Sequence, residues 1–496
     1  MQIQRSFSVP FLSIVLAMCL FPSIAAAATT DTYTTLVTFT GPNGAWPAYE
    51  SLVQGLDGNF YGTTNEGGAY GAGTVFKISP SGILTTLHSF CAQNCTDDGS
   101  RPAGGLVLGK DREFYGTTDF GGTYDSGTIY KITPTGTLTV LYSFCTQPNC
   151  TDGGYPLSGL VQARNGNFYG MAGYGGANIE FCNGGCGTVF EITPAGKFTT
   201  LYSFCSQPNC IDGGFPIGSL IQASNGNLYG VTQQGGANTG SDECQGDLPG
   251  CGTVFELTPS GQLTTLYNFC SQANCADGAL PYAGLVQASN GNFYGTTFVG
   301  GNPPPNAYGT VFKITPSGIL TLLHRFDPTD GVTPVASLIQ ATNGDLYGTT
   351  YRDGNGSGTI FGITPGGAFT KIHTFDVAEG NCEGGLVQGT DGSFYGTTFA
   401  STSEQGSVGT VFNLSRGLSS FVESLPSTGK VGISVVILGN NLTGTTSVAF
   451  NGTPATFKVL GASAIQTTVP AGATSGKIEV KTPTKTLESN ISFEIK

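Results

Sequence analysis

Charged residues are scarce in this chain: Asp, Glu, Lys and Arg make up 10% of its 496 residues. Disordered chains show the opposite balance, with much charge and little hydrophobicity, whereas 39% of this sequence is hydrophobic. The composition therefore favours a folded core. The formal net charge of -13 argues against nucleic acid or an anionic membrane surface as a partner, because both attract basic patches.

Long hydrophobic runs are lacking after the first 30 residues, so the sequence predicts no membrane span. The only extended apolar stretch, residues 11–24, is shorter than the roughly 20 residues that cross a bilayer. It follows Arg5 and precedes the small residues 25–28, an arrangement typical of a signal peptide. We assign residues 1–28 to a signal peptide and expect a secreted or cell-surface protein.

Glycine is abundant, with 77 residues, and many glycines belong to an internal repeat. The string Phe-Tyr-Gly-Thr-Thr at residues 60–64 recurs at residues 114–118 and, with changes, around Tyr169, Tyr229, Tyr294, Tyr347 and Tyr395. A second string, Gly-Thr-Val-Phe-Lys-Ile, begins at Gly73 and recurs from Gly127, Gly187, Gly252, Gly309, Gly358 and Gly409. Seven copies at a period of about 50 residues predict a repeat architecture.

Each copy predicts four short strands joined by tight turns. Residues 104–144 show the pattern: an apolar run, the Phe-Tyr-Gly-Thr-Thr string, a β-branched and aromatic run, and a last run ending in Ser-Phe. No segment shows sustained helical periodicity. We therefore predict an all-β protein in which residues 34–416 form a seven-bladed β-propeller.

The last run is missing after residue 414, and an extra copy stands at residues 35–39. The N-terminal strand is therefore expected to complete the seventh blade and to close the ring, which removes the exposed sheet edges.

The cysteines after residue 28 form local pairs, with Cys382 left over. The pairs are Cys91/Cys95, Cys145/Cys150, Cys182/Cys186, Cys205/Cys210, Cys244/Cys251 and Cys270/Cys275. Zinc sites use similar spacings, but they gather ligands from two knuckles, and these pairs are spread one per loop. In an exported chain we expect six loop-closing disulfides.

The loops that vary in length, and all six cysteine pairs, fall on one predicted face of the propeller. On this face Asp-Gly-x-x-Pro or Asn-Gly-x-x-Pro recurs, which is a turn motif and also places carboxylates at one repeat position. A ring of carboxylates and stacking side chains around the central opening would bind a cation or a polyhydroxyl ligand. The candidate ligand-binding residues are Trp46, Arg101, Tyr155, Phe215, Asp98, Asp152, Asp212, Asp277 and Asp330.

Catalytic motifs are lacking in the sequence. The three histidines, His88, His324 and His373, stand where other repeats have tyrosine, which indicates a structural role. The sequence contains no phosphate loop, nucleophile elbow or metal-spaced histidine cluster. We predict no catalytic residue, no metal ligand and no cofactor. Acid–base catalysis by paired carboxylates on the loop face stays an open alternative.

Residues 420–496 lose the repeat and read as successive short strands, which suits a β-sandwich. The strings Gly-Asn-Asn-Leu at 439–442, Val-Ala-Phe-Asn-Gly at 448–452 and Val-Pro-Ala-Gly at 469–472 resemble an IPT/TIG domain, which implies an immunoglobulin-like fold. The repeats resemble the GloVer tandem repeat of exported bacterial proteins of the choice-of-anchor type, on the strings at residues 57–64 and 73–78. That resemblance implies no established activity.

We expect an exported, monomeric, non-enzymatic binding or cell-surface protein whose partner is an extracellular carbohydrate or protein. The alternative is an extracellular hydrolase or lyase that acts on polysaccharide with carboxylates of the loop face.

Overall fold

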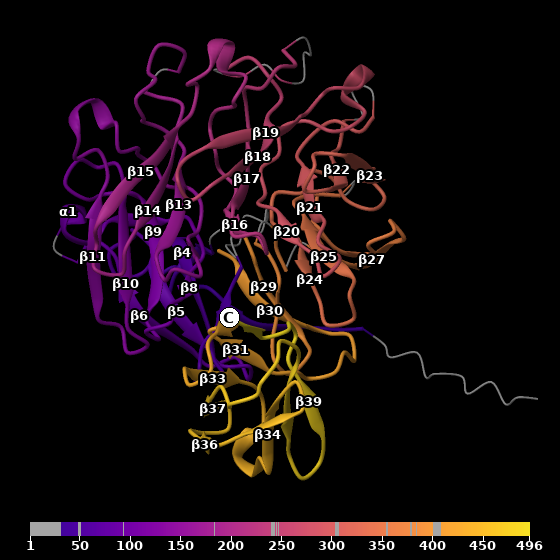
Figure 1. Cartoon of the computed structure of the whole chain (residues 1–496). Helices are drawn as coiled ribbons and strands as arrows, with labels where there is room; N and C mark the ends of the chain where they lie inside the picture. The colour runs from indigo at the N-terminus through magenta and orange to yellow at the C-terminus, as the bar shows by residue number, and fades with distance from the viewer. Residues whose placement is uncertain are drawn as a thin grey trace, which may run out of the picture. The chain divides into compact units, whose positions relative to one another are not determined.

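The computed structural model describes residues 31–496 except 48–50, 93, 183, 240–243, 245, 247, 303–306, 354–355, 377–378, 383 and 400–407. These residues form one compact unit. The predicted signal peptide, residues 1–28, lies outside the described residues. The protein is all-β as predicted (Figure 1). The short helical segments of the described part are α1 (Cys95–Asp98), η1 (Pro148–Cys150), η2 (Pro208–Cys210), η4 (Ala273–Cys275) and η5 (Leu442–Gly444).

The predicted repeats fold as antiparallel sheets of four main strands, and we number the repeats 1 to 7 by these sheets. Repeat 1 contains β2 (Ala45–Pro47), β3 (Val53–Gln54), β4 (Phe60–Glu66), β5 (Thr74–Ile78) and β6 (Leu84–Ser89). Repeat 2 contains β7 (Ser100–Pro102), β8 (Val107–Leu108), β9 (Phe114–Phe120), β10 (Thr128–Ile132) and β11 (Leu138–Ser143). Repeat 3 contains β12 (Val161–Gln162), β13 (Phe168–Ala172), β14 (Thr188–Ile192) and β15 (Phe198–Ser203).

The later repeats keep the same order of strands. Repeat 4 contains β16 (Ile221–Gln222), β17 (Leu228–Thr232), β18 (Thr253–Leu257) and β19 (Leu263–Asn268). Repeat 5 contains β20 (Val286–Gln287), β21 (Phe293–Thr297), β22 (Thr310–Ile314) and β23 (Leu320–Arg325). Repeat 6 contains β24 (Ile339–Gln340), β25 (Leu346–Thr350), β26 (Thr359–Ile363) and β27 (Phe369–Thr374). Repeat 7 contains β28 (Val387–Gln388), β29 (Phe394–Thr398), β30 (Thr410–Ser415) and, from the N-terminus, β1 (Thr32–Thr38).

Neighbouring sheets pack through the aromatic residues of the second strand. The Tyr61 ring stacks on Phe114 of repeat 2 at a centroid distance of 4.1 Å, and Tyr115 stacks on Phe168 of repeat 3 at 3.9 Å. The glycine that follows this tyrosine leaves room for a ring, since a Cβ at Gly62 would lie 2.7 Å from the Phe76 ring. The repeated string therefore specifies sheets that are buried on both faces, as in the blades of a propeller.

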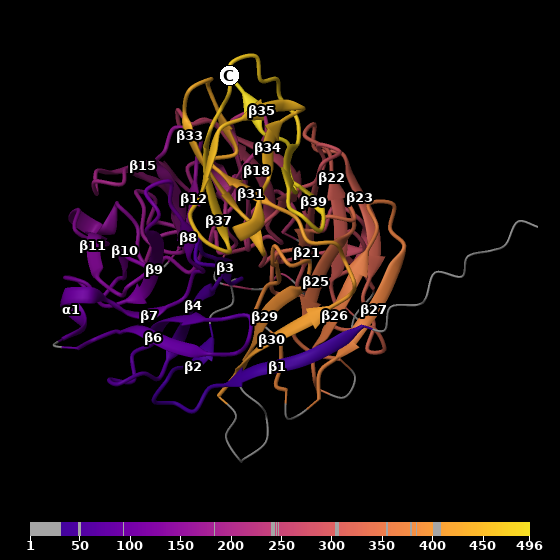
Figure 2. The same cartoon turned by 90° about the horizontal axis from the view of Figure 1, so that it is seen from below.

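The N-terminal strand joins the last repeat to the first. The predicted pairing is confirmed: β1 runs antiparallel to β30, with Thr32 opposite Ser415 and Thr38 opposite Thr410 (Figure 2). A register shift falls between Thr35 and Val37, so Leu36 lies in an irregularity of the ladder. The stacking also continues from repeat 7 to repeat 1, where the Phe60 and Tyr395 rings lie 3.9 Å apart.

A glutamine in the first strand links most neighbouring repeats. The side-chain oxygen of Gln388 accepts a hydrogen bond from Thr342 N at 2.9 Å, and that of Gln54 accepts one from Thr390 N at 3.0 Å. The second link again joins repeat 7 to repeat 1. Repeat 2 has Leu108 at the glutamine position, so the link between repeats 1 and 2 cannot form.

The C-terminal residues form two four-stranded sheets and one two-stranded sheet. Their strands are β31 (Glu423–Leu425), β32 (Thr428–Gly429), β33 (Ser434–Leu438), β34 (Ser447–Phe450), β35 (Thr453–Ala455), β36 (Phe457–Val459), β37 (Ala464–Thr468), β38 (Ile478–Lys481), β39 (Thr486–Glu488) and β40 (Glu494–Ile495). The two larger sheets share one buried cluster, to which Ile437 and Ile465 contribute from one sheet and Val448 and Val480 from the other.

The C-terminal sheets contact repeat 1, where Ser463 Oγ donates a hydrogen bond of 2.8 Å to Leu56 O. Membrane-spanning helices are not found: none of the helical segments in the described ranges has the length and apolar character to cross a bilayer.

The contacts of residues 32–39 with the last and first repeats lead us to expect unequal effects of two substitutions near the N-terminus. Phe39 is 1% exposed and packs edge-on against Phe76, so Phe39→Ala should destabilise the protein by about 3–5 kcal/mol. Thr34 on β1 is exposed, so Thr34→Ala should change the free energy of unfolding by less than about 0.5 kcal/mol. Denaturant unfolding of both variants measures this. Equal midpoints for the two would show that the N-terminal strand contributes little to the ring.

Candidate functional site

The Asp-Gly-x-x-Pro turns of different repeats share one geometry, which sets the direction of the predicted carboxylates. Asp212 is fully buried, and its carboxylate accepts hydrogen bonds from Tyr202 OH at 2.8 Å and from Ser206 N at 2.9 Å. Asp152 and Asp277 are buried in the same way and bind the hydroxyls of fourth-strand tyrosines at 2.7 and 2.8 Å. These three carboxylates are therefore engaged within their own repeats.

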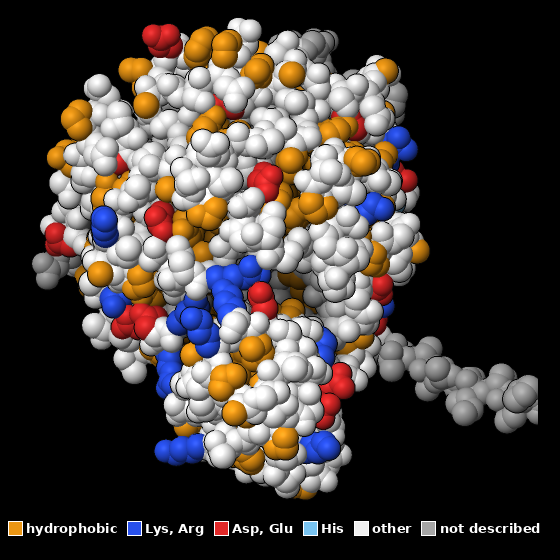
Figure 3. All heavy atoms as spheres, viewed as in Figure 1, with side chains coloured by type: hydrophobic (Ala, Val, Ile, Leu, Met, Phe, Trp, Pro, Cys, Tyr) orange, Lys and Arg blue, Asp and Glu red, His pale blue; other side chains and the backbone are white. Residues whose placement is uncertain are grey.

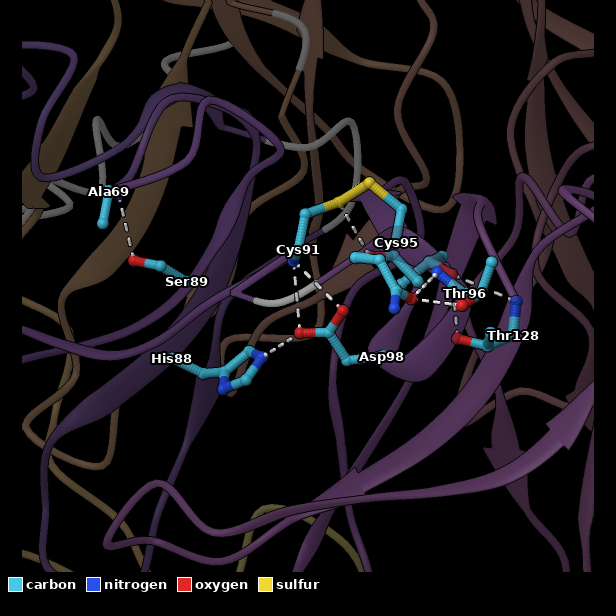
Figure 4. Close-up of polar contacts among 11 residues, drawn as sticks. Ala69, His88, Ser89, Cys91, Cys95, Thr96, Asp98 and Thr128 are labelled. Carbon is cyan, nitrogen blue, oxygen red and sulfur yellow. Dashed lines mark hydrogen bonds and ion pairs between the residues drawn. A yellow bond between two sulfur atoms is a disulfide. The ribbon is translucent and has the colours of Figure 1, made fainter. Parts of the chain in front are cut away.

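Histidine replaces the tyrosine on the fourth strand of repeats 1, 5 and 6. His88 Nε2 lies 2.9 Å from Asp98 Oδ2, next to the Cys91–Cys95 disulfide (Figure 4). His324 Nε2 lies 2.7 Å from Asp330 Oδ2. After the fourth strand of repeat 6, Glu379 takes the place of the aspartate, and its Oε2 lies 2.9 Å from His373 Nε2. The predicted structural role of the histidines agrees with these contacts. The five candidate aspartates bind the fourth strand, at the sheet edge opposite the first strand, instead of converging on one another.

The candidate residues that precede the proline lie between successive repeats. Trp46 stacks on Phe399 at 5.4 Å, and Phe215 packs edge-on against Tyr174 at 5.3 Å. Tyr155 also packs edge-on against Tyr174, at 5.6 Å. Arg101 lies 5.5 Å over the Phe120 ring and 3.7 Å from the carboxylate of Glu66. Their role in ligand binding stays a prediction.

These pre-proline residues share a strained backbone. Trp46, Arg101, Tyr155, Phe215, Leu280 and Thr333 all have φ between 52° and 53°. Residues with side chains rarely adopt this region, and a β-branched residue such as Thr333 least of all. Their N–H groups bind the preceding repeat, as Phe215 N does to Cys186 O at 2.9 Å. The strain therefore serves to fasten one repeat to the next.

A cavity of about 350 Å³ opens beside these turns, among repeats 3 to 6. Its lining comes from the residue after each proline and the two that follow it, and from the end of the second strand. The lining residues are Leu157, Ile217, Gly218, Tyr282, Ala283, Gly284, Phe298, Val335, Ala336, Ser337 and Tyr351.

Small residues form the buried part of this lining. Gly218, Ala283, Gly284 and Ala336 are buried, and the repeats meet closely there, because a Cβ at Gly218 would lie 2.6 Å from Gly284 N. Three aromatic side chains of the lining, Tyr282, Phe298 and Tyr351, are partly exposed.

Few polar groups border the cavity. Tyr282 OH accepts a hydrogen bond of 2.6 Å from Gln233 Nε2, and the Tyr282 and Phe298 rings lie 4.7 Å apart. Arg352 lies 4.7 Å over the Tyr351 ring. The lining includes no carboxylate, imidazole, thiol or amine. The cavity can therefore stack on a flat apolar face and hydrogen-bond a few hydroxyl or amide groups.

None of the nine candidate residues lines this cavity. The predicted stacking residues precede each proline, whereas the residue that follows the proline, as at Tyr282, lines the cavity. The available signal was the departure from the repeat: Phe298 and Tyr351 stand at a position occupied by Asn65, Asp119 and Gly173 in repeats 1 to 3.

Asp119 is unusual at that position. Its buried Oδ1 has no hydrogen-bond partner among the described residues. Burial raises the pKa of this carboxyl to about 6, and the nearby Arg101 guanidinium opposes part of the rise.

Charged side chains are sparse on the face in Figure 3, apart from a group of Lys and Arg beside the C-terminal sheets.

All six predicted disulfides are confirmed. Cys382 is buried and belongs to none of them, and its sulfur lies 3.5 Å from Thr397 O. The pairs lie one per loop as predicted, and in two repeats the disulfides of two loops meet. Cys182 Sγ lies 4.0 Å from Cys205 Sγ, and the sulfurs of Cys244, Cys251, Cys270 and Cys275 all lie within 4.8 Å of one another. Separate loops of one sheet converge there, which the spacing within each loop could not show.

Comparison with known proteins gives a match to one family. The model of the Gloeobacter/Verrucomicrobia repeat matches residues 23–181, 93–242 and 243–457. No curated protein matches the chain.

Solved structures show similarity at low identity. A fungal alcohol oxidase of the AA5 family, in complex with copper, has 12% identity and a TM-score of 0.51, over 93% of this chain and 99% of the other. A polysaccharide lyase has 13% identity and a TM-score of 0.44, over 76% and 90%. A gluconolactonase from Xanthomonas campestris has 12% identity and a TM-score of 0.37, over 79% and 92%. The first similarity concerns the fold alone.

The buried turn carboxylates predict a large loss of stability on truncation. Asp212→Ala leaves the Tyr202 hydroxyl and two backbone N–H groups without their acceptor, and each such buried group costs about 1–3 kcal/mol. Tyr202→Phe removes the bonds of this hydroxyl to Asp212 and Ser206 but leaves the backbone N–H groups of the turn paired, and should cost only about 1 kcal/mol. Thermal unfolding of both variants measures the difference. A loss for Asp212→Ala no greater than that for Tyr202→Phe would mean that the carboxylate does not support the turn.

Asp119 predicts a pH dependence of stability. Because its folded-state pKa of about 6 exceeds the ordinary value of 3.8, the native state holds the proton more tightly than the unfolded chain does. Its contribution to stability therefore falls as pH rises from about 4 to about 6 and is constant above that. The free energy of unfolding of Asp119→Asn should equal that of the wild type at about pH 3.5 and exceed it above about pH 6. Glu180→Gln, at an exposed residue, should show no such divergence in denaturant midpoints.

Proposed function

The chain belongs to the Gloeobacter/Verrucomicrobia repeat family, and from this premise we propose that residues 34–416 form a seven-bladed β-propeller. The support is the agreement between the contacts that join repeat 7 to repeat 1 and those that join the other repeats. Trp46 N of repeat 1 donates to Val408 O of repeat 7 at 2.8 Å, as Phe215 N does to Cys186 O of the preceding repeat at 2.9 Å. Residues 420–496 are proposed to form an IPT/TIG domain with an immunoglobulin-like fold, which their two packed antiparallel sheets support.

We propose that the protein is an exported, non-enzymatic binding protein whose ligand occupies the cavity lined by Tyr282, Phe298 and Tyr351. The observation that carries this proposal is the character of the lining: partly exposed aromatic rings stand over small residues, and no carboxylate, imidazole, thiol or amine is among them. General acid–base and nucleophilic catalysis depend on such groups. The six disulfides support an oxidising compartment, and hence export.

The ligand class that suits this cavity is an extracellular carbohydrate. A pyranose ring offers a flat face of C–H groups to an aromatic side chain, while its hydroxyls can bind groups such as Tyr282 OH and Ser337 at the lining. A cavity of about 350 Å³ has the size of a small-molecule site, so one or two sugar units would fill it. An aromatic side chain of a protein partner is the second source of a flat apolar face.

The pre-proline residues Trp46, Arg101, Tyr155 and Phe215 belong to this proposal as the surrounding rim. Tyr155 and Phe215 lie two positions before Leu157 and Ile217 of the lining, and Trp46 and Arg101 hold the corresponding positions in repeats 1 and 2. A longer ligand would extend over them.

The alternative function is a polysaccharide-acting enzyme, and Asp119 is the observation that favours it. An unpartnered buried carboxyl with a pKa near 6 is poised to exchange a proton near neutral pH. It stands at the repeat position of Phe298 and Tyr351, which line the cavity.

A glycan array followed by calorimetric titration tests the proposal. For the best glycan found, Tyr282→Ala should weaken binding about 10-fold or more, because loss of a stacked ring removes about 1.4 kcal/mol. Tyr124→Ala replaces an aromatic side chain that is 57% exposed and outside the cavity, and should leave the affinity unchanged.

Two outcomes would contradict the binding assignment. Equal effects of the two tyrosine variants would place the ligand elsewhere. Chemical turnover of the bound glycan that Asp119→Asn abolishes would establish the enzyme in place of the binding protein.

A further inference from the structure

Two repeats bring a pair of disulfides together. In repeat 4, the Cys244–Cys251 disulfide comes from the loop between the second and third strands, and Cys270–Cys275 comes from the loop after the fourth strand. The sulfurs of all four lie within 4.8 Å of one another, and three of the cysteines are buried. Repeat 3 repeats this arrangement with Cys182–Cys186 and Cys205–Cys210, in which the sulfurs of Cys182, Cys186 and Cys205 lie within the same distance.

Four sulfurs at this separation match the geometry of a tetrathiolate metal site. With a Zn–S bond of about 2.3 Å, the sulfurs of a tetrahedral site lie about 3.8 Å apart. Once both sulfur–sulfur bonds are broken, side-chain rotations can bring the four sulfurs of repeat 4, which lie within 4.8 Å of one another, to coordinating positions. Each site also draws its ligands from two loops, as structural zinc sites do.

The spacing is also suitable in three of the four loops, whereas Cys244 and Cys251 are seven positions apart. The pairs Cys182/Cys186, Cys205/Cys210 and Cys270/Cys275 are separated by four or five residues, close to the ligand spacing of zinc knuckles. Other disulfides of the chain provide the contrast: Cys91–Cys95 and Cys145–Cys150 have similar spacings but join no second pair in a metal-sized group within the described ranges.

We propose that each of these two four-cysteine clusters is a redox-controlled site for a soft divalent cation, with zinc as the expected ion. In the oxidised protein each cluster holds two disulfides. An external thiol, which is oxidised to a disulfide, or a phosphine with water, which yields the phosphine oxide, supplies four electrons and four protons per cluster and leaves four thiols. Binding of one Zn²⁺ then releases these four protons and leaves four thiolates on the metal. The loops are cross-linked in either state, by sulfur–sulfur bonds or by the metal.

The site is tested by metal titration of the full-length mature chain. After reduction with a phosphine under anaerobic conditions and removal of the reductant, Co²⁺ is added as a spectroscopic probe, followed by Zn²⁺. The proposal expects intense thiolate-to-cobalt charge transfer with tetrahedral visible bands, two equivalents bound per chain, and displacement by zinc. The oxidised protein should give no such bands.

Paired variants locate the ions. Cys244→Ser with Cys251→Ser should remove one equivalent and leave the other, and so should Cys182→Ser with Cys186→Ser. Cys91→Ser with Cys95→Ser is the matched control, because it removes a disulfide of the same spacing and should keep both equivalents.

A second measurement covers the case in which reduction loosens the fold. Alkylation of the reduced chain with and without Zn²⁺, read by mass spectrometry, should show protection of the eight cysteines in the two clusters, while Cys91, Cys95, Cys145 and Cys150 react in both conditions. Equal reactivity of all twelve in the presence of zinc would overturn the proposal, as would the binding of two equivalents of cobalt by either cluster variant.

Discussion

The packing of each repeat against the next is the constraint on which the rest of the structure depends. A single four-stranded sheet of this sequence has large aromatic residues on both faces, as Phe60 and Tyr61 show at 1% exposure each. It can bury them only between two neighbours. The end repeats would each lack a neighbour in an open array, and the stacking of Phe60 on Tyr395 together with the pairing of β1 with β30 meets that need.

The glycines, the strained turns and the buried carboxylates all follow from this packing. The strained residue before each proline places its N–H on the preceding repeat, and the aspartate three residues earlier holds the turn by binding the fourth strand. Features that resembled a ligand site in the sequence therefore have internal partners. The cavity is lined by residues that this packing does not fix, at positions such as 282 and 351, where the residue type varies among repeats.

This division explains what could be predicted from the sequence. The second-strand string specified the sheets, and the missing run after residue 414 specified the pairing with β1, because both are requirements that every repeat must meet. The direction of the Asp212 side chain could not be read in this way, since a turn aspartate can face the opening or the Tyr202 hydroxyl. The cavity was also missed, because Tyr282, Phe298 and Tyr351 are far apart in the chain and each departs from the repeat differently. The meeting of Cys182 with Cys205 required knowledge of how two loops fold over one sheet.

The pairing of β1 with β30 also sets an order in time. A polypeptide emerges from the ribosome, or from an export channel, with its N-terminus first. Residues 32–38 are then among the first of the described chain to appear, yet their partner, residues 410–415, belongs to the last repeat. Until then the early repeats form an incomplete array in which β1 lacks its partner strand. Their loop disulfides, each spanning four to seven residues, can already form. The local disulfides can therefore form first, and the long-range pairing of β1 with β30 forms last. The last exposed strand edge is covered only after residues 410–415 have emerged.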